Sequence, residues 1–393
     1  MARILITGGR APAALDLARQ FHRSGHVVFA ADSAPWMLCG ASRAIAKSYR
    51  LPEPKRKPHE FAAEVARICG TEAIDLIIPT CEEVFYLGRF KDDLEAHARV
   101  FCPGIEDLHR LHSKWEFATL VRQTGGFGSS VRSPDSWRLT DAADIRSLPE
   151  PPEKLVFKPV YSRFAVETMI RPDLARAMGV DIRADRPWIA QSCILGREFC
   201  SYAVARDGIV RAQAIYEPTW RAGKGAGIYF EPRSIPAIDR FVAGLARHFD
   251  LSGQIAFDFI ADASGELFVI ECNPRATSGV HLFDGDLAPA FLPDSGLALR
   301  PIEPRPTPRM VASAMIPFGA LQALRGGHVR SDAARFCRDF GRARDVIWSW
   351  RDPYPAFYAL VGAAAFSWKA MQHRVSATAA TTLDIAWDGG TIG

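Results

Sequence analysis

The sequence predicts a protein of mixed α/β and α+β architecture that contains more than one domain. The N-terminal region alternates strand-like and helical segments, which is typical of α/β proteins, whereas residues 155–216 contain a series of short strand-like runs. A hairpin pattern at 253–279 adds a further β-rich region. The chain has 393 residues, of which 48% are hydrophobic, so it can build two or three ordinary cores.

Net charge and cysteine spacing exclude several classes of protein. The chain has 48 basic and 44 acidic residues and a net charge of +4, which does not indicate a nucleic-acid partner. Its 8 cysteines form no CxxC pair and no regular framework, which is typical of reduced thiols in a cytoplasmic protein. The N-terminus MARILITGGR has no apolar signal segment, so we do not expect secretion.

The N-terminal segment has the pattern of a β-α-β unit. An apolar strand at Ile4–Thr7 is followed by a Gly8-Gly9 turn, a helical segment at 13–24 and a second strand that ends at Asp32. This order predicts a Rossmann-like domain. A nicotinamide dinucleotide site is not favoured, because TGGRAPAALD lacks the third glycine and the spacing of the GxGxxG motif.

A second unit follows, with a helix at 58–69 and a buried strand at 76–79. Ligands in an open α/β sheet collect beyond the carboxyl ends of its strands. The candidate substrate contacts are therefore Gly8 to Arg10, Asp32 and Thr80 to Glu83. As an alternative, Glu82 and Glu83 could serve only as acids at the start of the next helix.

The region 113–250 predicts two helices separated by several strands. Ser113 can cap a helix that begins at Lys114 and ends at Gly125-Gly126. Asp207-Gly208 predicts a tight hairpin turn. The expected strands are 155–159, 165–170, 188–195, 199–205 and 209–216, and the second helix is expected at 233–250.

Two cationic features of this region could contact phosphate groups. Lys158 interrupts the apolar strand at 155–159, and a lysine at the end of a buried strand needs an anionic partner. The segment 221–227, RAGKGAG, contains Lys224 and is rich in glycine, so it is suited to closing over phosphates. A plain solvent-exposed loop is an equal alternative for this segment.

The hairpin at 253–279 predicts a magnesium site. If its turn is centred between residues 264 and 265, Asp258 lies opposite Glu271, and Asn273 shares their face. Two carboxylates and an amide oxygen are ligands that Mg²⁺ takes beside nucleotide phosphates. A solvated polar face is the alternative, but Arg275 adds a cation one strand step further, which such a face does not require.

The region after residue 279 differs in composition. Residues 287–299 are apolar and predict a core helix, and 300–308 predict a proline-rich linker. Residues 354–368 predict an apolar helix that is too short to cross a bilayer. We expect this helix to pack on the core, and contact with a membrane surface or a partner is the alternative.

Taken in order, these features resemble the ATP-grasp superfamily over residues 1–295. Lys114 and Lys158 resemble the two lysines that contact the phosphates of ATP in that family. Asp258, Glu271 and Asn273 match its Mg²⁺ triad in order and spacing. The resemblance therefore implies ATP and Mg²⁺ (or Mn²⁺) as cofactors.

The same resemblance implies positions for the base and the ribose. The segment with Gln191, Ser192 and Ile194 looks like the hinge strand whose backbone reads the adenine edge, and Glu198 stands where the family has its ribose-binding acid. Arg275 resembles the arginine of the NPR run in the carbamoyl-phosphate-synthetase-like branch. Two departures are Gln191 in place of a more frequent glutamate, and a short glycine-free loop at 161–164.

The implied domain order has four parts. They are a pre-ATP-grasp α/β domain at 1–112, a small ATP-grasp subdomain at 113–190, a large subdomain with the Mg²⁺ site at 191–299 and a C-terminal extension at 300–393. The implied activity is an ATP-dependent ligase that activates a carboxylate as an acyl phosphate and couples it to an amine. Arg275 and Lys158 are its expected catalytic residues.

The expected partners are small-molecule substrates and a second copy of the chain, without nucleic acid. Two alternative functions remain open from the sequence. One is a bicarbonate-activating carboxylase or a carbamoyl-phosphate-type enzyme of the same superfamily. The other is a protein that binds ATP without turnover, which the glycine-free loop after Lys158 would permit.

Overall fold

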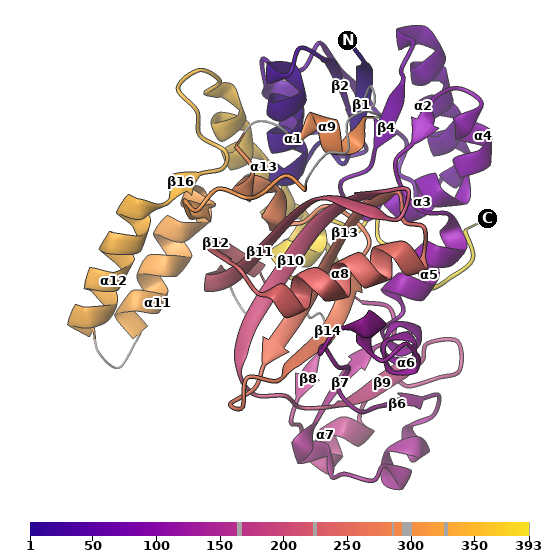
Figure 1. Ribbon diagram of the computed structural model, residues 1–393, viewed down its shortest axis with the longest axis vertical. Helices are drawn as coiled ribbons and strands as arrows, with labels where there is room; N and C mark the ends of the chain where they lie inside the picture. The colour runs from indigo at the N-terminus through magenta and orange to yellow at the C-terminus, as the bar shows by residue number, and fades with distance from the viewer. Residues whose placement is uncertain (163–166, 223–225, 285–286, 293–300, 326–328, 393) are drawn as a thin grey trace.

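The computed structural model describes residues 1–162, 167–222, 226–284, 287–292, 301–325 and 329–392. These residues form three β-sheets with helices packed around them. In Figure 1 the N-terminal sheet lies at the top, a seven-stranded sheet in the middle and a four-stranded sheet at the bottom. The predicted mixture of α/β and α+β architecture is confirmed.

The N-terminal sheet is parallel, with β1 at its centre and the strand order β3-β2-β1-β4-β5. Ile4 and Ile6 pack in one hydrophobic cluster with α1, whereas Leu5 packs in another with α2, so helices cover both faces. The predicted β-α-β unit is confirmed. The elements are β1 (Arg3–Thr7), α1 (Pro12–Arg23), β2 (Val27–Asp32), β3 (Lys47–Arg50), α2 (Pro58–Glu72), β4 (Leu76–Ile78), α3 (Val84–Arg89), α4 (Lys91–Glu95), β5 (Arg99–Val100) and α5 (Ile105–His112).

The four-stranded sheet is antiparallel, with the order β6-β9-β7-β8. Ser113 caps the start of the helix at Lys114–Gln123 as predicted, because its hydroxyl accepts a hydrogen bond of 3.2 Å from the Glu116 amide. Of the strand expected at 165–170, only 169–170 is confirmed; residues 167–168 are not in a strand, and 165–166 lie outside the described ranges. The elements are α6 (Lys114–Gln123), β6 (Ser136–Leu139), β7 (Leu155–Pro159), β8 (Met169–Ile170), α7 (Leu174–Met178) and β9 (Trp188–Ser192).

The seven-stranded sheet has the order β14-β13-β10-β11-β12-β15-β16 and is covered on one side by α8. The tight turn at Asp207-Gly208 is confirmed by φ values of 53° and 70° at the two residues. The helix expected from residue 233 begins later, because Arg233 still pairs with Ile215 in the sheet. The elements are β10 (Arg197–Arg206), β11 (Ile209–Ala222), β12 (Ala226–Arg233), α8 (Pro236–His248), β13 (Gly253–Ala261), β14 (Leu267–Asn273), β15 (Arg309–Met310) and β16 (Arg344–Asp345).

The C-terminal region adds helices to the outside of the two larger sheets. The core helix expected at 287–299 is described only as a short helix at 288–291, and residues 293–300 lie outside the described ranges. The apolar helix expected at 354–368 is confirmed and extends to His373. No helix within the described residues is both long and apolar enough to cross a membrane. The elements are α9 (Ala288–Phe291), α10 (Ala312–Ala314), α11 (Ala320–Arg325), α12 (Val329–Arg342), α13 (Tyr354–His373) and α14 (Ala377–Ala380).

The last residues of the chain return to the N-terminal domain. The Trp387 ring stacks on His109 with centroids 3.9 Å apart and also lies 4.7 Å from the ring of Tyr161. Trp387 is buried in the same cluster as Phe85. The tail therefore covers the end of α5 and the loop after β7, next to the lysines expected to contact phosphate.

Candidate active site

The hairpin of β13 and β14 brings the predicted acids together. Asp258 lies opposite Glu271 and Ala256 lies opposite Asn273, which confirms the predicted pairing. Nearer the turn the strands pair one residue out of the predicted register, and a bulge after Asp258 corrects the offset. Asp258, Glu271 and Asn273 therefore share one face of the sheet.

The pKa values of the two acids are separated by their surroundings. Burial and the charge of Glu271 raise the pKa of Asp258. Burial would also raise the pKa of Glu271, but Lys114 and Lys158 outweigh it and lower the pKa of that carboxyl. Two adjacent, half-buried acids of this kind are stabilised by a cation.

Lys114 stands at the start of α6 and spans two loops. Its Nζ donates a hydrogen bond of 2.7 Å to the Ser162 carbonyl and lies 3.7 Å from Oε2 of Glu271. The Lys114 amide donates to the Val160 carbonyl at 3.1 Å. The lysine is thereby held between the loop after β7 and the acidic face of the hairpin.

Lys158 faces the same space from the four-stranded sheet. Phe157 belongs to the hydrophobic cluster on one side of β7, so the adjacent Lys158 points to the other side. Burial lowers the pKa of Lys158 to about 8, and the nearby Lys114 adds to this effect despite the opposing charges of Glu271 and Asp258. A buried lysine with a lowered pKa gains stability from a bound anion.

Arg275 connects the hairpin to the N-terminal domain. Its Nε donates to Oε1 of Glu82 at 2.8 Å, and its Nη2 donates to Oδ1 of Asn273 at 3.2 Å. The interpretation of Glu82 as only a helix-opening acid is therefore wrong. Glu83, which precedes α3, accepts hydrogen bonds from the Thr80 and Cys81 amides and from the Thr7 hydroxyl of β1, so it also does more than open the helix.

His112 is a residue of this site that the sequence did not reveal. It is buried at the end of α5, and burial lowers the pKa of its ring to about 4. The charges that act on it most are those of Glu82, Lys114, Arg275 and Glu271. Its position two residues before Lys114 is the only local signal that could have pointed to it.

The residues expected at the adenine and ribose lie further along the two sheets. Gln191 is buried, pairs opposite Val156 on the face of Lys158, and donates to the Ser136 hydroxyl at 3.0 Å. Glu198 lies two residues from Cys200, which pairs with Asp258, and forms an ion pair with Arg221. The hinge strand is shorter than expected, since β9 ends at Ser192.

The remaining predicted nucleotide contacts are Ser192, Ile194 and Lys224, and the structure describes the first two of them. The Ser192 amide donates to the Asp135 carbonyl at 2.9 Å, so it is already engaged by the protein. Ile194 follows β9 in a half-buried position without regular structure. Lys224 lies outside the described residues, and its flanks at 222 and 226 are the facing ends of β11 and β12.

The candidate metal ligands consist of two acids and one amide. Among the described residues, no three His, Cys, Asp or Glu side chains are grouped as a metal site. This result is compatible with the Asp258–Glu271–Asn273 set, whose third member is an amide. Asn273 Nδ2 lies 3.4 Å from Oδ2 of Asp258, which shows that the amide reaches the acids.

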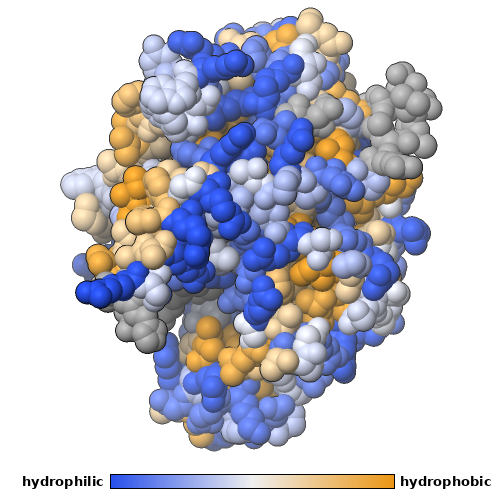
Figure 2. All heavy atoms as spheres, turned by 60° about the vertical axis from the view of Figure 1, so that its left-hand side comes forward, coloured by the Kyte–Doolittle hydropathy of each residue, from blue (hydrophilic) through white to orange (hydrophobic). Residues whose placement is uncertain are grey.

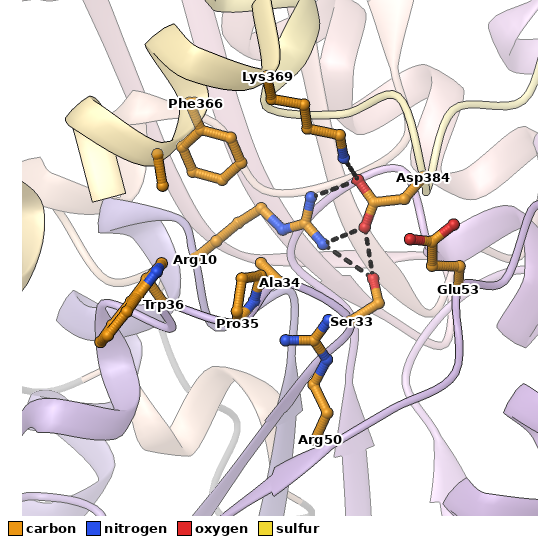
Figure 3. Close-up of a pocket in the computed structure, with 11 residues that line it drawn as sticks. Arg10, Ser33, Ala34, Pro35, Trp36, Arg50, Glu53, Phe366, Lys369 and Asp384 are labelled. Atoms are coloured by element: carbon orange, nitrogen blue, oxygen red, sulfur yellow. Dashed lines mark hydrogen bonds and ion pairs between the residues drawn. The ribbon is translucent and has the colours of Figure 1, made fainter. Parts of the chain in front are cut away.

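The crevice at the carboxyl ends of β1 and β2 is occupied by the C-terminal tail. Figure 3 shows the Arg10 guanidinium directed at Asp384, with Ser33 and Lys369 beside it. Arg10 also pairs with Asp32, with 2.5 Å between Nη2 and Oδ1. A cavity of about 90 Å³ remains between this cluster and α13. The predicted substrate contacts Arg10 and Asp32 are thus engaged with each other and with the tail.

Comparisons with known proteins identify the fold. No protein-family model matches this chain, and no curated protein matches it. Among similar solved structures, an L-amino acid ligase from Bacillus licheniformis has 16% identity and a TM-score of 0.52, over 71% of this chain and 68% of that one. Phosphoribosylamine–glycine ligase from Thermotoga maritima has 14% identity and a TM-score of 0.55, over 77% of this chain and 78% of that one.

A third similar structure is the biotin carboxylase domain of the 2-oxoglutarate carboxylase from Hydrogenobacter thermophilus, determined as a dimer with ADP, its magnesium salt and bicarbonate. It has 13% identity and a TM-score of 0.54, over 71% of this chain and 65% of that one. At such identities the likeness establishes the fold alone. The chain has the ATP-grasp fold, as its sequence predicted.

Proposed function

We propose that this protein is an ATP-dependent ligase that activates a carboxylate as an acyl phosphate and couples it to an amine, with release of ADP and phosphate. One observation supports this most directly: two buried lysines face two half-buried acids across a single space. A bound anion would stabilise the charged form of Lys158, and a bound cation would stabilise the ionised form of Asp258. A nucleotide triphosphate with its divalent ion satisfies both.

The residues fit a divalent ion and the phosphates of ATP. Asp258, Glu271 and Asn273 would hold Mg²⁺ or Mn²⁺, which would neutralise charge on the phosphoryl group during transfer. Lys114 would contact the phosphates from the start of α6, where the positive end of the helix dipole also favours an anion. Lys158 would act as a catalytic cation on the transferred group.

Arg275 is the second proposed catalytic residue. Glu82 holds its guanidinium from the side of the N-terminal domain, with 2.8 Å between Nε and Oε1. Such an anchored guanidinium can donate two parallel hydrogen bonds to an attacking carboxylate or to the oxyanion formed when the amine adds. The proposal places the carboxylate substrate between Arg275 and the phosphates.

The remaining cofactor contacts belong to the base and ribose end. Gln191, Ser192 and Ile194 are proposed to border the adenine, and Glu198 the ribose. The face that Gln191 shares with Lys158 supports this arrangement, as does the face that Glu198 shares with Asp258. Lys224, between the two facing strand ends, is proposed to close over the phosphates.

The organisation and partners form part of the same proposal. We expect domains at 1–112, 113–190, 191–299 and 300–393, small-molecule substrates, no nucleic acid and a cytoplasmic homodimer. The dimer of the Hydrogenobacter carboxylase domain supports the last point. The comparison does not extend to the identity of the acid or the amine.

The test is a search for ligation products. The full chain would be incubated with ATP, Mg²⁺ and pooled acids and amines, and mass spectrometry would detect a product lighter than its two parents by one water. Glu271→Gln should abolish product and ADP, whereas Glu266→Gln, an exposed acid paired with Arg132, should retain both. Equal ADP release by wild type and Glu271→Gln would contradict the proposal.

The same assay distinguishes the alternative functions. The similarity to a bicarbonate-bound biotin carboxylase domain makes bicarbonate the second candidate substrate. ADP formed with bicarbonate and without any organic acid would favour that reaction. ATP binding without ADP in any mixture would indicate a binding protein without turnover.

A further inference from the structure

The outward side of α13 is apolar, which reverses the usual pattern of a surface helix. Five of its large side chains are between 43% and 66% exposed: Phe357, Leu360, Val361, Trp368 and Met371. Their spacing places them on one side of the helix. The opposite side is buried at Pro355, Gly362 and Ala370. Residues 353–368 contain no charged side chain.

Aromatic residues from two other segments extend this side, which we call the α13 surface. Trp348 and Trp350 pack edge to face with centroids 5.2 Å apart, and Trp350 is 87% exposed. Trp36, from the loop after β2, contacts the Tyr358 ring at 6.1 Å. Figure 2, which brings forward the left-hand side of Figure 1, shows apolar side chains gathered in patches among hydrophilic ones.

The charge around the α13 surface is positive. Between residues 346 and 383 the sequence has a single acid, Asp352. Asp352 is buried and forms an ion pair with Arg19, with 2.9 Å between Oδ2 and Nε. The exposed charged side chains of the same stretch include Arg351 and Arg374. Arg43 lies beside them, with its guanidinium carbon 5.8 Å from the centre of the Tyr354 ring. No exposed carboxylate of this stretch offsets these cations.

We infer that the α13 surface docks on an anionic lipid membrane, with the helix lying in the plane of the interface. Exposed tryptophan and tyrosine with a basic rim are the side chains that favour the boundary between headgroups and acyl chains. The inner side of α13 packs on the N-terminal domain through Ala356 and Ala359, near Leu15 and Leu38, so the helix can lie on a bilayer without leaving its place. This inference is independent of the ligase proposal.

A second copy of the chain fits the same surface less well. A two-fold contact would bring the cations of one copy, Arg351, Arg374 and Arg43, toward those of the other, and like charges across an interface disfavour association. An anionic bilayer instead attracts all of them, so charge complementarity selects the membrane.

The test is co-sedimentation of the full chain with lipid vesicles. We expect binding to vesicles of equal parts phosphatidylcholine and phosphatidylglycerol, weak binding to phosphatidylcholine alone, and loss of binding at high salt. Trp368→Glu should weaken vesicle affinity at least about tenfold, because it places a charge in the apolar contact. Ile209→Glu, on an exposed isoleucine of another surface, should leave the affinity unchanged.

Two further readouts make the outcome decisive. Each variant should melt at the wild-type temperature, since both sites are exposed, and Arg351→Glu provides a second variant that changes only the charge. The inference is overturned if the wild-type protein remains in the supernatant with anionic vesicles. It is also overturned if wild type and Trp368→Glu bind these vesicles with equal affinity. Sedimentation velocity showing a dimer that Trp368→Glu dissolves, without vesicle binding, would assign the surface to a second copy and also overturn it.

Discussion

Asp258 and Glu271 face each other because Ile270 is an unpaired bulge residue between Glu271 and the turn. Val269 is buried in the cluster beneath α8, although it lies only two residues before Glu271. A regular strand would place both residues on the same face. The bulge therefore turns Glu271 toward Asp258 and Lys114, so the acidic pair depends on a local irregularity rather than on strand alternation.

Replacing Asp258 by Asn should separate activity from stability. We expect ATP turnover to fall by about 10²-fold or more, because a proposed metal ligand is lost. The raised pKa of Asp258 means that ionising this acid destabilises the folded state as pH rises, so Asp258→Asn should be at least as stable as wild type in EDTA at pH 8. ADP release and thermal melting measure the two effects.

The stability difference for this variant should shrink as the pH falls toward about 3, where the acid is protonated in both states. Glu266→Gln is the matched control on the same hairpin. A variant that melts much lower than wild type while keeping its turnover would show that Asp258 is a structural residue.

Lys158→Met should weaken nucleotide binding and stabilise the free protein. The pKa of Lys158, lowered to about 8 by burial, means that the charged lysine opposes folding below that pH, and that this effect declines between about pH 8 and 10. Methionine removes the opposition, so the variant should melt higher at pH 7 in the absence of ATP. Its affinity for ATP should fall roughly 10-fold to 100-fold, as expected for a lost charged hydrogen bond.

Calorimetry with ATP and Mg²⁺, together with melting curves at pH 7 and pH 10, would measure both effects. Lys154→Met is the control, since Lys154 is exposed four residues earlier in the chain. Unchanged ATP affinity with lower stability would assign Lys158 to the core alone.

Arg275→Lys should lower kcat more than it changes the KM for ATP. Lysine keeps the charge and can still reach Glu82, but it cannot donate two parallel hydrogen bonds to a carboxylate. We expect kcat to fall by about 10²-fold. Arg132→Lys, in an exposed ion pair with Glu266, should change neither parameter. A higher KM for ATP with an unchanged kcat would instead place Arg275 at the nucleotide.

Local features of the site could be predicted from the sequence. The Ser113 cap, the strand with Lys158 and the pairing of Asp258 with Glu271 depend on neighbouring residues or on a short hairpin. The hairpin also shows the limit of such reasoning. The observed turn centre lies half a residue before the predicted one, and the bulge after Asp258 compensates for this difference. A single inserted residue in a strand has no distinct sequence signal here.

Contacts between distant segments could not be predicted. Glu82 and Arg275 are 193 residues apart, and Arg10 and Asp384 are 374 apart. Such pairs are decided by how whole domains pack, which strand and helix periodicity does not encode. The same reason explains why the burial of His112 and the docking of Trp387 were missed.

Asp384 should anchor the C-terminal tail in a pH-dependent way. Burial opposes the ionised form of Asp384, but hydrogen bonds and the charge of Arg10 outweigh it and hold the pKa of the carboxyl below its ordinary value. A carboxyl with a lowered pKa stabilises the fold above its unfolded pKa of about 4, and this stabilisation is lost as pH falls further. Asp384→Asn should therefore reduce the free energy of unfolding at pH 7.

The reduction should stay below about 3 kcal/mol, because Arg10 keeps Asp32 as a partner when Asp384 is replaced. Urea denaturation at pH 7 and at pH 3 measures it, and the difference from wild type should be smaller at the lower pH. Asp388→Asn is the control, since Asp388 is an exposed acid of the same tail that pairs with Lys55. A loss of stability that is equal at both pH values would show that Asp384 acts through packing, and that its ion pair with Arg10 does not hold the tail in place.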